Sequence, residues 1–316
     1  CLFYNQKSLK IDQCTFNKGL GSIIINEFDQ QNEQKTFYNQ NFSSTLPIDD
    51  NLKSISIINC KFSNITNENV IIINQKDISL YITSTSFISC ISNEAVIHLT
   101  ETRCFTMTHV CTYMSGTNNQ DASGSILWYD MKDDDFLLCL YNTFVETKMK
   151  SNDKTSVIDI QDGDQYFRCN NITGSSCKGF HFNTPNCFSF GLSTVVECEN
   201  NCFMMAGFNG QSENVKDKLI EMSNFINNGS HLIKPNGHYS YTLIMDRCVL
   251  LSTNENSVFA DKEDKIEIKV MNSIILTRYG NSTKITFTNC TRVEYDKSHI
   301  TLHAHYTNGV ECVGPE

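Results

Sequence analysis

The feature that most constrains the fold of this 316-residue chain is a short run of β-branched residues that recurs along it. Seven runs share the pattern, each introduced by a small or polar residue, and they begin at Ile23, Val70, Val96, Ile126, Val157, Leu232 and Val258. The four runs from Val70 to Val157 start at nearly even intervals, and Leu232 and Val258 are separated by a similar interval. Short strands that recur in this way are typical of a solenoid in which each repeat forms one coil.

Two longer intervals fit the same repeat. The stretch between Val157 and Leu232 is long enough for three coils. The stretch between Ile23 and Val70 indicates one coil with an insertion near residues 28–51, which are rich in Gln and Asn and poor in apolar residues.

A large apolar residue stands a short distance before each run, in the order Phe16, Phe62, Phe87, Tyr113, Phe144, Phe225 and Leu250. Before it stands a second segment in which apolar and polar residues alternate, as in 54–58 and 266–270. We therefore expect an all-β protein, a single right-handed parallel β-helix of roughly nine to eleven coils that spans residues 1–316 as one domain. The main alternative is an antiparallel β-sandwich, in which hairpins such as the one Asp-Gly pair, Asp162–Gly163, join the strands.

The position two residues before the large apolar residue holds small polar or thiol side chains, namely Cys14, Cys60, Thr85, Cys111, Asn142 and Cys248. In a parallel stack, equivalent residues of successive coils lie about 4.8 Å apart, so these groups line up as a ladder at one corner. Cys14 and Cys60 then fall within the Cα separation that a disulfide accepts. Either the neighbouring cysteines are paired or they form a ladder of buried free thiols.

The chain has 15 cysteines, which points to an oxidising compartment because secreted proteins keep such numbers by pairing them. The count is odd, so at least one cysteine is free or intermolecular. Five lie near residues 167–213, where the coil pattern is weakest, and we expect disulfides to pin this Cys-rich irregular segment rather than a thiol nucleophile activated by His181. The disulfide candidates are Cys14, Cys60, Cys104, Cys111, Cys169, Cys177, Cys187, Cys198 and Cys202.

Charge and hydropathy exclude two classes of partner. With 25 Lys and Arg against 35 Asp and Glu, the formal net charge is −10, whereas nucleic-acid binding needs a basic surface. No run approaches the roughly 20 apolar residues of a transmembrane helix. The sequence starts at Cys1 without a basic leader, which indicates that a signal peptide has been removed or that the sequence begins within a longer protein.

Six Asn-x-Ser/Thr sequons are glycosylation candidates, at Asn41, Asn64, Asn171, Asn228, Asn281 and Asn289. A chain with this much Asn, Ser and Thr is expected to contain about six by chance. An extracellular location therefore depends on the cysteines and the fold rather than on the sequons.

Short motifs carry a family resemblance. Gly21-Ser22-Ile23, Glu94-Ala95-Val96 and Gly124-Ser125-Ile126 look like a Gly-Gly-Ala-Ile motif, and residues 225–228 match a Phe-x-x-Asn motif. Over most of its length the chain thus resembles the right-handed parallel β-helix repeats of polymorphic outer-membrane-type proteins and related protist surface proteins. The resemblance implies an extracellular, surface-associated protein used in adhesion or in a coat.

Pectin-active enzymes use the same fold and need clustered carboxylates, either as calcium ligands or as general acid and base. The densest acidic run lies at 130–135, and three more Asp residues follow about one coil later at 159–164. The candidates for a calcium site are Asp133, Asp135, Asp162 and Asp164, against the alternative of a solvated loop and a turn, which we favour.

Three histidines near the end of the chain, His299, His303 and His305, share strand parity and therefore face one side of a strand. His303 and His305 are candidate ligands for a transition metal. We favour the alternative, a solvent-facing edge of the last coil.

The sequence shows no convergent catalytic cluster, and we assign no catalytic residue and no cofactor. We expect a non-catalytic extracellular or cell-surface protein for adhesion or structural coating, whose partners are protein or glycan surface ligands, other copies or assembly subunits. One alternative is a polysaccharide lyase or glycoside hydrolase, with a groove of Asp and Arg or Lys around Asp133 and Asp159. Another is a structural component of a larger assembly or filament, in which the long sides of the solenoid pack on partners.

Overall fold

The computed structural model describes residues 8–17, 23–24, 34–38, 41–42, 54–66, 69–74, 78–100, 102–119, 121–149, 155–183, 185–198, 203–205, 218–226, 232–235, 241–251, 259, 266–276 and 285–293. These residues form thirty-five strands and no helix. Accordingly, the described ranges contain no helix long and apolar enough to cross a membrane.

The strands form two twelve-stranded sheets, A and B, an eight-stranded sheet C and a three-stranded sheet D, and every strand pairing in the described residues is parallel. In spatial order, sheet A consists of β34 (Ile285–Thr288), β32 (Ile266–Met271), β30 (Tyr241–Asp246), β27 (Lys218–Glu221), β24 (Cys187–Gly191), β21 (Asp164–Arg168), β17 (Phe136–Leu140), β13 (Cys104–Thr108), β9 (Ser79–Thr83), β6 (Ser54–Ile58), β1 (Ser8–Asp12) and β4 (Gln34–Tyr38). Sheet B consists of β35 (Thr291–Val293), β33 (Ile274–Leu276), β31 (Val249–Leu251), β28 (Asn224–Ile226), β25 (Thr194–Val196), β22 (Asn171–Thr173), β18 (Thr143–Val145), β14 (Cys111–Tyr113), β10 (Ser86–Ile88), β7 (Lys61–Ser63), β2 (Thr15–Asn17) and β5 (Asn41–Phe42).

The remaining two sheets complete the coils. Sheet C consists of β29 (Ile233–Pro235), β26 (Phe203–Met205), β23 (Lys178–Asn183), β20 (Ser156–Gln161), β16 (Gly124–Asp130), β12 (Ile97–Thr100), β8 (Ile71–Asn74) and β3 (Ile23–Ile24). Sheet D, which lies between sheets B and C in the chain, consists of β11 (Ile91–Ser92), β15 (Gly116–Thr117) and β19 (Lys148–Met149).

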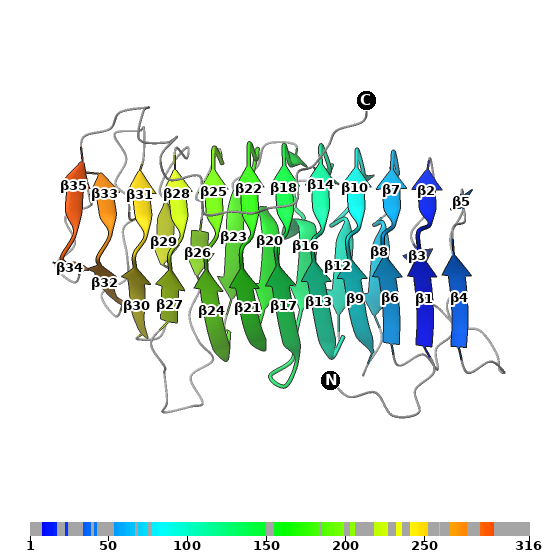
Figure 1. Ribbon diagram of the computed structural model, residues 1–316, viewed down its shortest axis with the longest axis horizontal. Coiled ribbons are helices and arrows are strands. Elements are labelled where there is room, and N and C mark those ends of the chain that lie inside the picture. The colour runs from blue at the N-terminus through cyan, green and yellow to red at the C-terminus, as the bar shows by residue number, and fades with distance from the viewer. Residues whose placement is uncertain are drawn as a thin grey trace.

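Each full coil passes through sheet A, turns into sheet B and returns through sheet C (Figure 1). In this view the chain rises along the near side, descends behind it and advances from right to left, so the β-helix is right-handed. This is the hand that parallel crossovers take. The prediction of a right-handed parallel β-helix is thereby confirmed.

One hydrophobic core runs from Leu9 to Ile275 along the axis of the helix. Strands of sheet A bury every second residue, as the alternating sequence predicts. In sheet B the rings of Phe16, Phe62 and Phe87 stack with centroids 4.5 and 4.9 Å apart. The recurrent aromatic residue of the sequence is therefore one column of the core, and offset stacking adds to the free energy gained by burying its area.

The strand register shows that the predicted repeat around Tyr113 is displaced by one residue. Sheet B pairs Thr112, not Tyr113, with Phe87 on one side and with Phe144 on the other. The ladder position two residues earlier therefore holds Val110 instead of the predicted Cys111. A slip of one residue turns every side chain of a strand to the opposite face, and the search for an aromatic residue selected the wrong parity in this coil.

The predicted insertion near 28–51 contains the first rung of the solenoid. β4 and β5 pair in parallel with β1 and β2, on the side opposite β6 and β7. A segment later in the chain thus occupies the end of both sheets (Figure 1). The pairing places Phe42 in register with Phe16, so the segment continues the sheet B repeat despite its polar composition.

Sheets A and B contain twelve strands each, so the described solenoid has twelve rungs, more than the predicted nine to eleven coils. One extra rung is β4–β5. In addition, the last coil is short, since Asn272 and Asn289 occupy equivalent positions only 17 residues apart, whereas Cys60 and Thr85 are 25 apart. Dividing the length by a constant repeat therefore underestimates the number of rungs.

Regular rungs also continue through the segment near 167–213 that the sequence indicated as irregular. Strands β21 to β26 cover much of it and pair in register with their neighbours. The buried residues there include Phe167, Phe180, Phe182 and Phe190, whose rings contact one another edge to face or stacked. Because this part of the core is aromatic, a search for β-branched runs misses it.

Candidate functional site on the outer face of sheet A

A row of mostly buried side chains fixes the turn from sheet A to sheet B. One residue per rung contributes, two positions before the central residue of each sheet B strand, and we call the row the inner ladder: Cys14, Cys60, Thr85, Val110, Asn142, Asn170, Ser193, Ser223, Cys248, Ser273 and Cys290. The backbone N–H of one member donates to the side chain of the next where that side chain is Asn, Ser or Thr, as from Val110 to Asn142 Oδ1 (2.9 Å) and from Asn170 to Ser193 Oγ (3.1 Å). These bonds satisfy buried amides that the strand pairing leaves out.

The cysteines of the inner ladder are free thiols. Cys14 Sγ lies 3.3 Å from the carbonyl oxygen of Asp12, and Cys60 Sγ lies 3.1 Å from that of Ile58, so each thiol donates within its own turn. Burial raises the pKa of Cys60 to about 11 and that of Cys248 to about 12. Of the two alternatives left by the sequence, the structure has the ladder of buried thiols and not the Cys14–Cys60 disulfide.

No disulfide joins two of the described cysteines. Among the other candidates, Cys104, Cys169, Cys177, Cys187 and Cys198 are reduced thiols, Cys111 is disulfide-bonded, and Cys202 lies outside the described residues. In the segment near 167–213, the predicted disulfides do not form between the described cysteines, which lie on regular rungs. Cys177 and Cys198 are buried in the core, whereas Cys169 and Cys187 are half-buried at the outer side of sheet A.

Immediately before each inner-ladder residue stands a residue with left-handed backbone, φ between 46° and 58°. We call this row the outer ridge: Gln13, Asn59, Ser84, His109, Tyr141, Cys169, Leu192, Met222, Arg247, Asn272 and Asn289. The conformation costs about 1–2 kcal/mol for most side chains and least for Gly, Asn and Asp. It persists because the ridge N–H groups from Gln13 to Asn272 donate to the next rung, as from Tyr141 to the carbonyl of Arg168 (3.1 Å).

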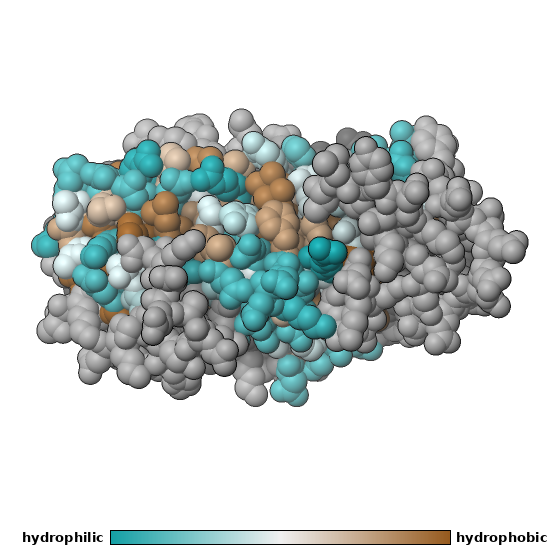
Figure 2. Space-filling view, turned by 90° about the horizontal axis from the view of Figure 1, so that it is seen from below, coloured by the Kyte–Doolittle hydropathy of each residue, from teal (hydrophilic) through white to brown (hydrophobic). Residues whose placement is uncertain are grey.

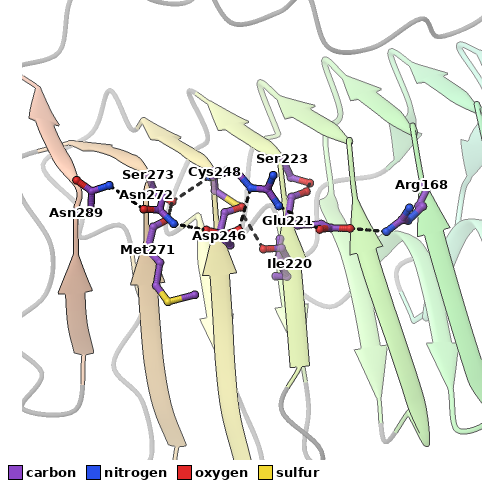
Figure 3. Close-up of polar contacts among 11 residues, drawn as sticks. Arg168, Ile220, Glu221, Ser223, Asp246, Cys248, Met271, Asn272, Ser273 and Asn289 are labelled. Carbon is purple, nitrogen blue, oxygen red and sulfur yellow. Dashed lines mark hydrogen bonds and ion pairs between the residues drawn. The ribbon is translucent and has the colours of Figure 1, made fainter.

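A connected row of charged and amide side chains joins members of the outer ridge to the ends of the sheet A strands that precede it (Figure 3). Arg168 and Arg247 both pair with Glu221, and Arg247 Nε also lies 2.9 Å from Asp246 Oδ2. Asp246 Oδ1 in turn accepts from Asn272 Nδ2 at 2.8 Å. Asn289 Nδ2 then donates to Asn272 Oδ1 at 2.8 Å, so the row ends at a predicted sequon.

Arg168 reaches Glu221 across the intervening strand β24, and Gly191 makes this possible. A Cβ added at Gly191 would lie 2.9 Å from Glu221 Cγ and 3.3 Å from the Glu221 carbonyl oxygen. Any side chain at this position would therefore displace the carboxylate from between the two arginines.

Apolar side chains flank the charged row on both sides. Leu138, Leu140, Tyr166 and Ile244 are half-buried on the outer face of sheet A, and Leu192 and Met222 are half-buried on the ridge. Tyr141 and Leu219 are 38% and 39% exposed and are the exposed large hydrophobic residues of the described chain. Seen from below, hydrophobic and hydrophilic residues are interspersed over the part of the surface that is not grey (Figure 2).

We call this surface the corner face: Leu138, Leu140, Tyr141, Tyr166, Leu192, Leu219, Met222 and Ile244 together with Arg168, Glu221, Asp246 and Arg247. Arginine and aromatic residues among exposed apolar side chains are typical of protein recognition surfaces. Strands β17 to β30 place these residues on successive rungs, so their side chains are held by a rigid sheet and the turns that leave it.

A second row lies on the outer face of sheet C, where the register aligns His98, Trp128, Asp159 and His181 on four successive strands. The ring of His98 stacks on Trp128 with centroids 4.2 Å apart. His98 Nδ1 lies 2.8 Å from Glu94 Oε2, and His181 Nδ1 lies 2.8 Å from Asp159 Oδ2. Each imidazole is thereby oriented by a carboxylate.

Burial shapes the chemistry of the sheet C row. It lowers the pKa of His98 from the ordinary histidine value although Glu94 opposes the shift. The other polar atoms, His98 Nε2, Trp128 Nε1, Asp159 Oδ1 and His181 Nε2, are buried without a hydrogen-bond partner. Two carboxylate–imidazole pairs of this kind can exchange protons, but they lie three rungs apart, about 14 Å, too far to act on one group.

Of the acidic candidates, Asp135 and Asp164 lie on neighbouring rungs, where the Asp164 N–H donates to the Asp135 carbonyl oxygen at 2.9 Å. Asp133 is exposed, and Asp135 is buried and accepts from the N–H of Lys132 (2.6 Å), with burial raising its pKa. Asp162 lies in the turn with Gly163, and Asp164 Oδ1 accepts from the Cys187 N–H at 3.1 Å. Within the described ranges no three His, Cys, Asp or Glu side chains form a metal-binding group.

The remaining candidates are spread along the rod. Asn64 and Asn289 are exposed in turns with left-handed backbone, and Asn171 is half-buried at the start of β22. Asn41 begins β5. Asn228, Asn281, His303 and His305 lie outside the described residues.

Comparison with family models, with curated proteins and with solved structures finds no match to this chain. Sequence reasoning named Asp159 and His181 singly, but it predicted neither the corner face nor the sheet C row. Their members stand at outward positions of the strands, where the alternating pattern allows either a polar or an apolar residue. Only the register of neighbouring rungs reveals them. The signal that does exist for the ridge is positional, since each ridge residue directly precedes an inner-ladder residue.

Proposed function

We propose that this protein is a non-catalytic extracellular or cell-surface β-helix protein that serves adhesion or structural coating through its corner face. The observation that carries the proposal is the row of exposed and half-buried apolar, aromatic and arginine side chains on successive rungs of sheet A. A rigid sheet holds these groups in place before a ligand arrives, which reduces the entropy lost on binding.

Three features of the surface support recognition of protein or glycan ligands rather than turnover of a substrate. The corner face presents its charges as ion pairs, Arg168–Glu221 and Arg247–Asp246, which give specificity but no free acid or base. Its apolar residues lie outside the core. The ladder and ridge hold every turn in one geometry, which suits binding to a fixed surface.

Binding of the purified full chain to immobilised extracellular-matrix proteins and to a glycan array tests the recognition role. We expect saturable binding to at least one surface, and at least roughly tenfold weaker binding by Leu219→Lys. Leu219 is exposed, so the variant is expected to fold, and Glu221 nearby accommodates the added charge. Binding that is absent from every surface, or unchanged in the variant, would contradict the proposal.

The location has its own test, non-reducing mass spectrometry of protein isolated from its native source. We expect N-glycans on Asn64, Asn171 or Asn289, the sequons of the described chain that reach the surface. A chain that is fully reduced and unglycosylated would refute the extracellular assignment.

A further inference from the structure

We propose that the outer face of sheet A packs against the same face of a second copy of this chain, with the corner face at the centre of the contact. The inference rests on the proposed recognition role of the corner face and names its partner.

The face is large enough for a stable contact. Twelve parallel strands about 4.8 Å apart make it about 53 Å long, and strands of about five residues make it about 17 Å wide. The resulting area is about 900 Å² on each copy, and a specific interface buries about 800 Å² per partner.

The charges of this face allow contact with a second copy of the chain, although the chain is acidic. Lys10 is paired with Asp12 at 2.9 Å and Lys269 with Glu267 at 3.3 Å, and both arginines of the corner face are paired with Glu221. The described part of this face is therefore close to electrically balanced, whereas the whole chain carries −10. Two copies approach each other with least repulsion through such a face, and an anionic membrane or nucleic acid finds no unpaired basic row on its described part.

The apolar residues of the outer ridge supply an independent argument. Three of the eleven ridge residues are Asn, where a left-handed backbone is tolerated best, whereas three members of the corner face, Tyr141, Leu192 and Met222, are bulky and apolar. These bulky residues raise the free energy of the isolated molecule twice, through the backbone and through exposed apolar area. Backbone hydrogen bonds hold this conformation along the ridge, so what distinguishes these three positions is an apolar side chain kept at the surface, as at an interface.

A second copy matches the chemistry of the face better than an unrelated ligand does. Flat sheets pack face to face at about 10 Å with their outward side chains interleaved. An isologous contact brings the same apolar centre and the same neutralised rim to both sides, and two-fold dimers are the commonest assemblies of soluble proteins.

The test is sedimentation equilibrium of the full chain over a concentration series. We expect a monomer–dimer equilibrium in the wild type and at least roughly tenfold weaker association for Leu219→Lys. Tyr141→Asn is the sharper variant, because it removes an interface side chain and relieves the strained backbone. It is expected to weaken association while leaving the unfolding temperature of the monomer unchanged or raised.

Glu197→Asn is the matched control, since Glu197 is exposed and has the same backbone conformation (φ 57°) at the turn that leaves sheet B. It should leave association unchanged. A wild type that stays monomeric at all concentrations, or an oligomer that neither Leu219→Lys nor Tyr141→Asn weakens, overturns the inference. If a monomeric wild type still binds an immobilised ligand in a Leu219-dependent way, the recognition role stands and only its assignment to a second copy fails.

Discussion

Replacing Asn142 tests the claim that the inner ladder, rather than the strands alone, holds the rungs together. The side chain of Asn142 is fully buried and makes three hydrogen bonds. Its Oδ1 accepts from the Val110 N–H at 2.9 Å, and its Nδ2 donates to the Met107 carbonyl at 3.0 Å and to Asn170 Oδ1 at 2.9 Å.

Asn142→Ala leaves the Val110 N–H and the Met107 carbonyl without these partners in the core. Asn170 Oδ1 loses less, because it still accepts from the Asn142 N–H at 3.2 Å. Each buried group left unsatisfied costs about 1–3 kcal/mol, so we expect a loss of about 2–6 kcal/mol in the free energy of unfolding. Few other single substitutions outside the aromatic core should have so large an effect.

Asn142→Ser separates the hydrogen bonds from packing. At Ser193 the ladder already uses a serine, which accepts from the N–H of the preceding rung at 3.1 Å and donates to the Gly191 carbonyl at 2.9 Å. A serine at position 142 should likewise satisfy the Val110 N–H, and Asn142→Ser should therefore be about 1–3 kcal/mol more stable than Asn142→Ala.

The assay is urea unfolding, with hydrogen exchange of the Val110 amide as a local readout and Asn118→Ala, an exposed position, as the control expected within about 0.5 kcal/mol of the wild type. Faster exchange at Val110 in the alanine variant than in the serine variant would support the assignment. The reasoning would be refuted if the free energies of unfolding of the alanine and serine variants differed by no more than about 0.5 kcal/mol, the margin allowed for the control. The hydrogen bond to Val110 would then contribute nothing.

Three further predictions follow from the same geometry. Phe62→Ala empties the middle of a stack and should lower the free energy of unfolding by about 3–5 kcal/mol in urea; a loss below about 1 kcal/mol would contradict the stacked core. Leu192→Gly should stabilise and Gly174→Ala destabilise, each by about 1 kcal/mol, since both positions have left-handed backbone; equal signs in thermal melts would argue against strain. Burial lowers the pKa of His98, so at mildly acidic pH the unfolded chain binds a proton more readily than the folded chain does. The free energy of unfolding should therefore fall as the pH drops below about 6.5. His98→Gln should flatten that part of the curve of unfolding temperature against pH, and an unchanged curve would exclude His98 as its cause.

The sequence predicted the coils because their core repeats. Phe16, Phe62 and Phe87 fall in one column, and a residue that stacks on its own equivalents leaves a period that can be read without a structure. The prediction failed where one coil filled a core column with a different type of residue. Thr112 replaces an aromatic residue in one coil, and Phe180 and Phe182 replace β-branched residues in another, so the composition changed although the position did not.

The end rung was beyond prediction for a different reason. β4 follows β1 in the chain but lies on its outer side, so chain order and rung order disagree there. A repeat search assumes that each coil stacks on the one before it. The polar composition of 28–51 then reads as an insertion, although the pairing of Thr15 with Asn41 shows a continuing sheet.

The outward columns explain why the fold was easier to predict than the site. An inward residue must satisfy the rungs above and below it, and so its type is constrained in every coil. An outward residue meets no such requirement, and Leu219 in β27 and Thr242 in β30 are equally compatible with a stable rung. What constrains the exterior is the outer ridge, because its left-handed backbone makes Asn favourable and Tyr141 or Leu192 unfavourable. Eight of the eleven ridge residues are nevertheless not Asn, so what distinguishes Tyr141, Leu192 and Met222 is an apolar side chain at the surface, and their rungs are where binding is to be sought.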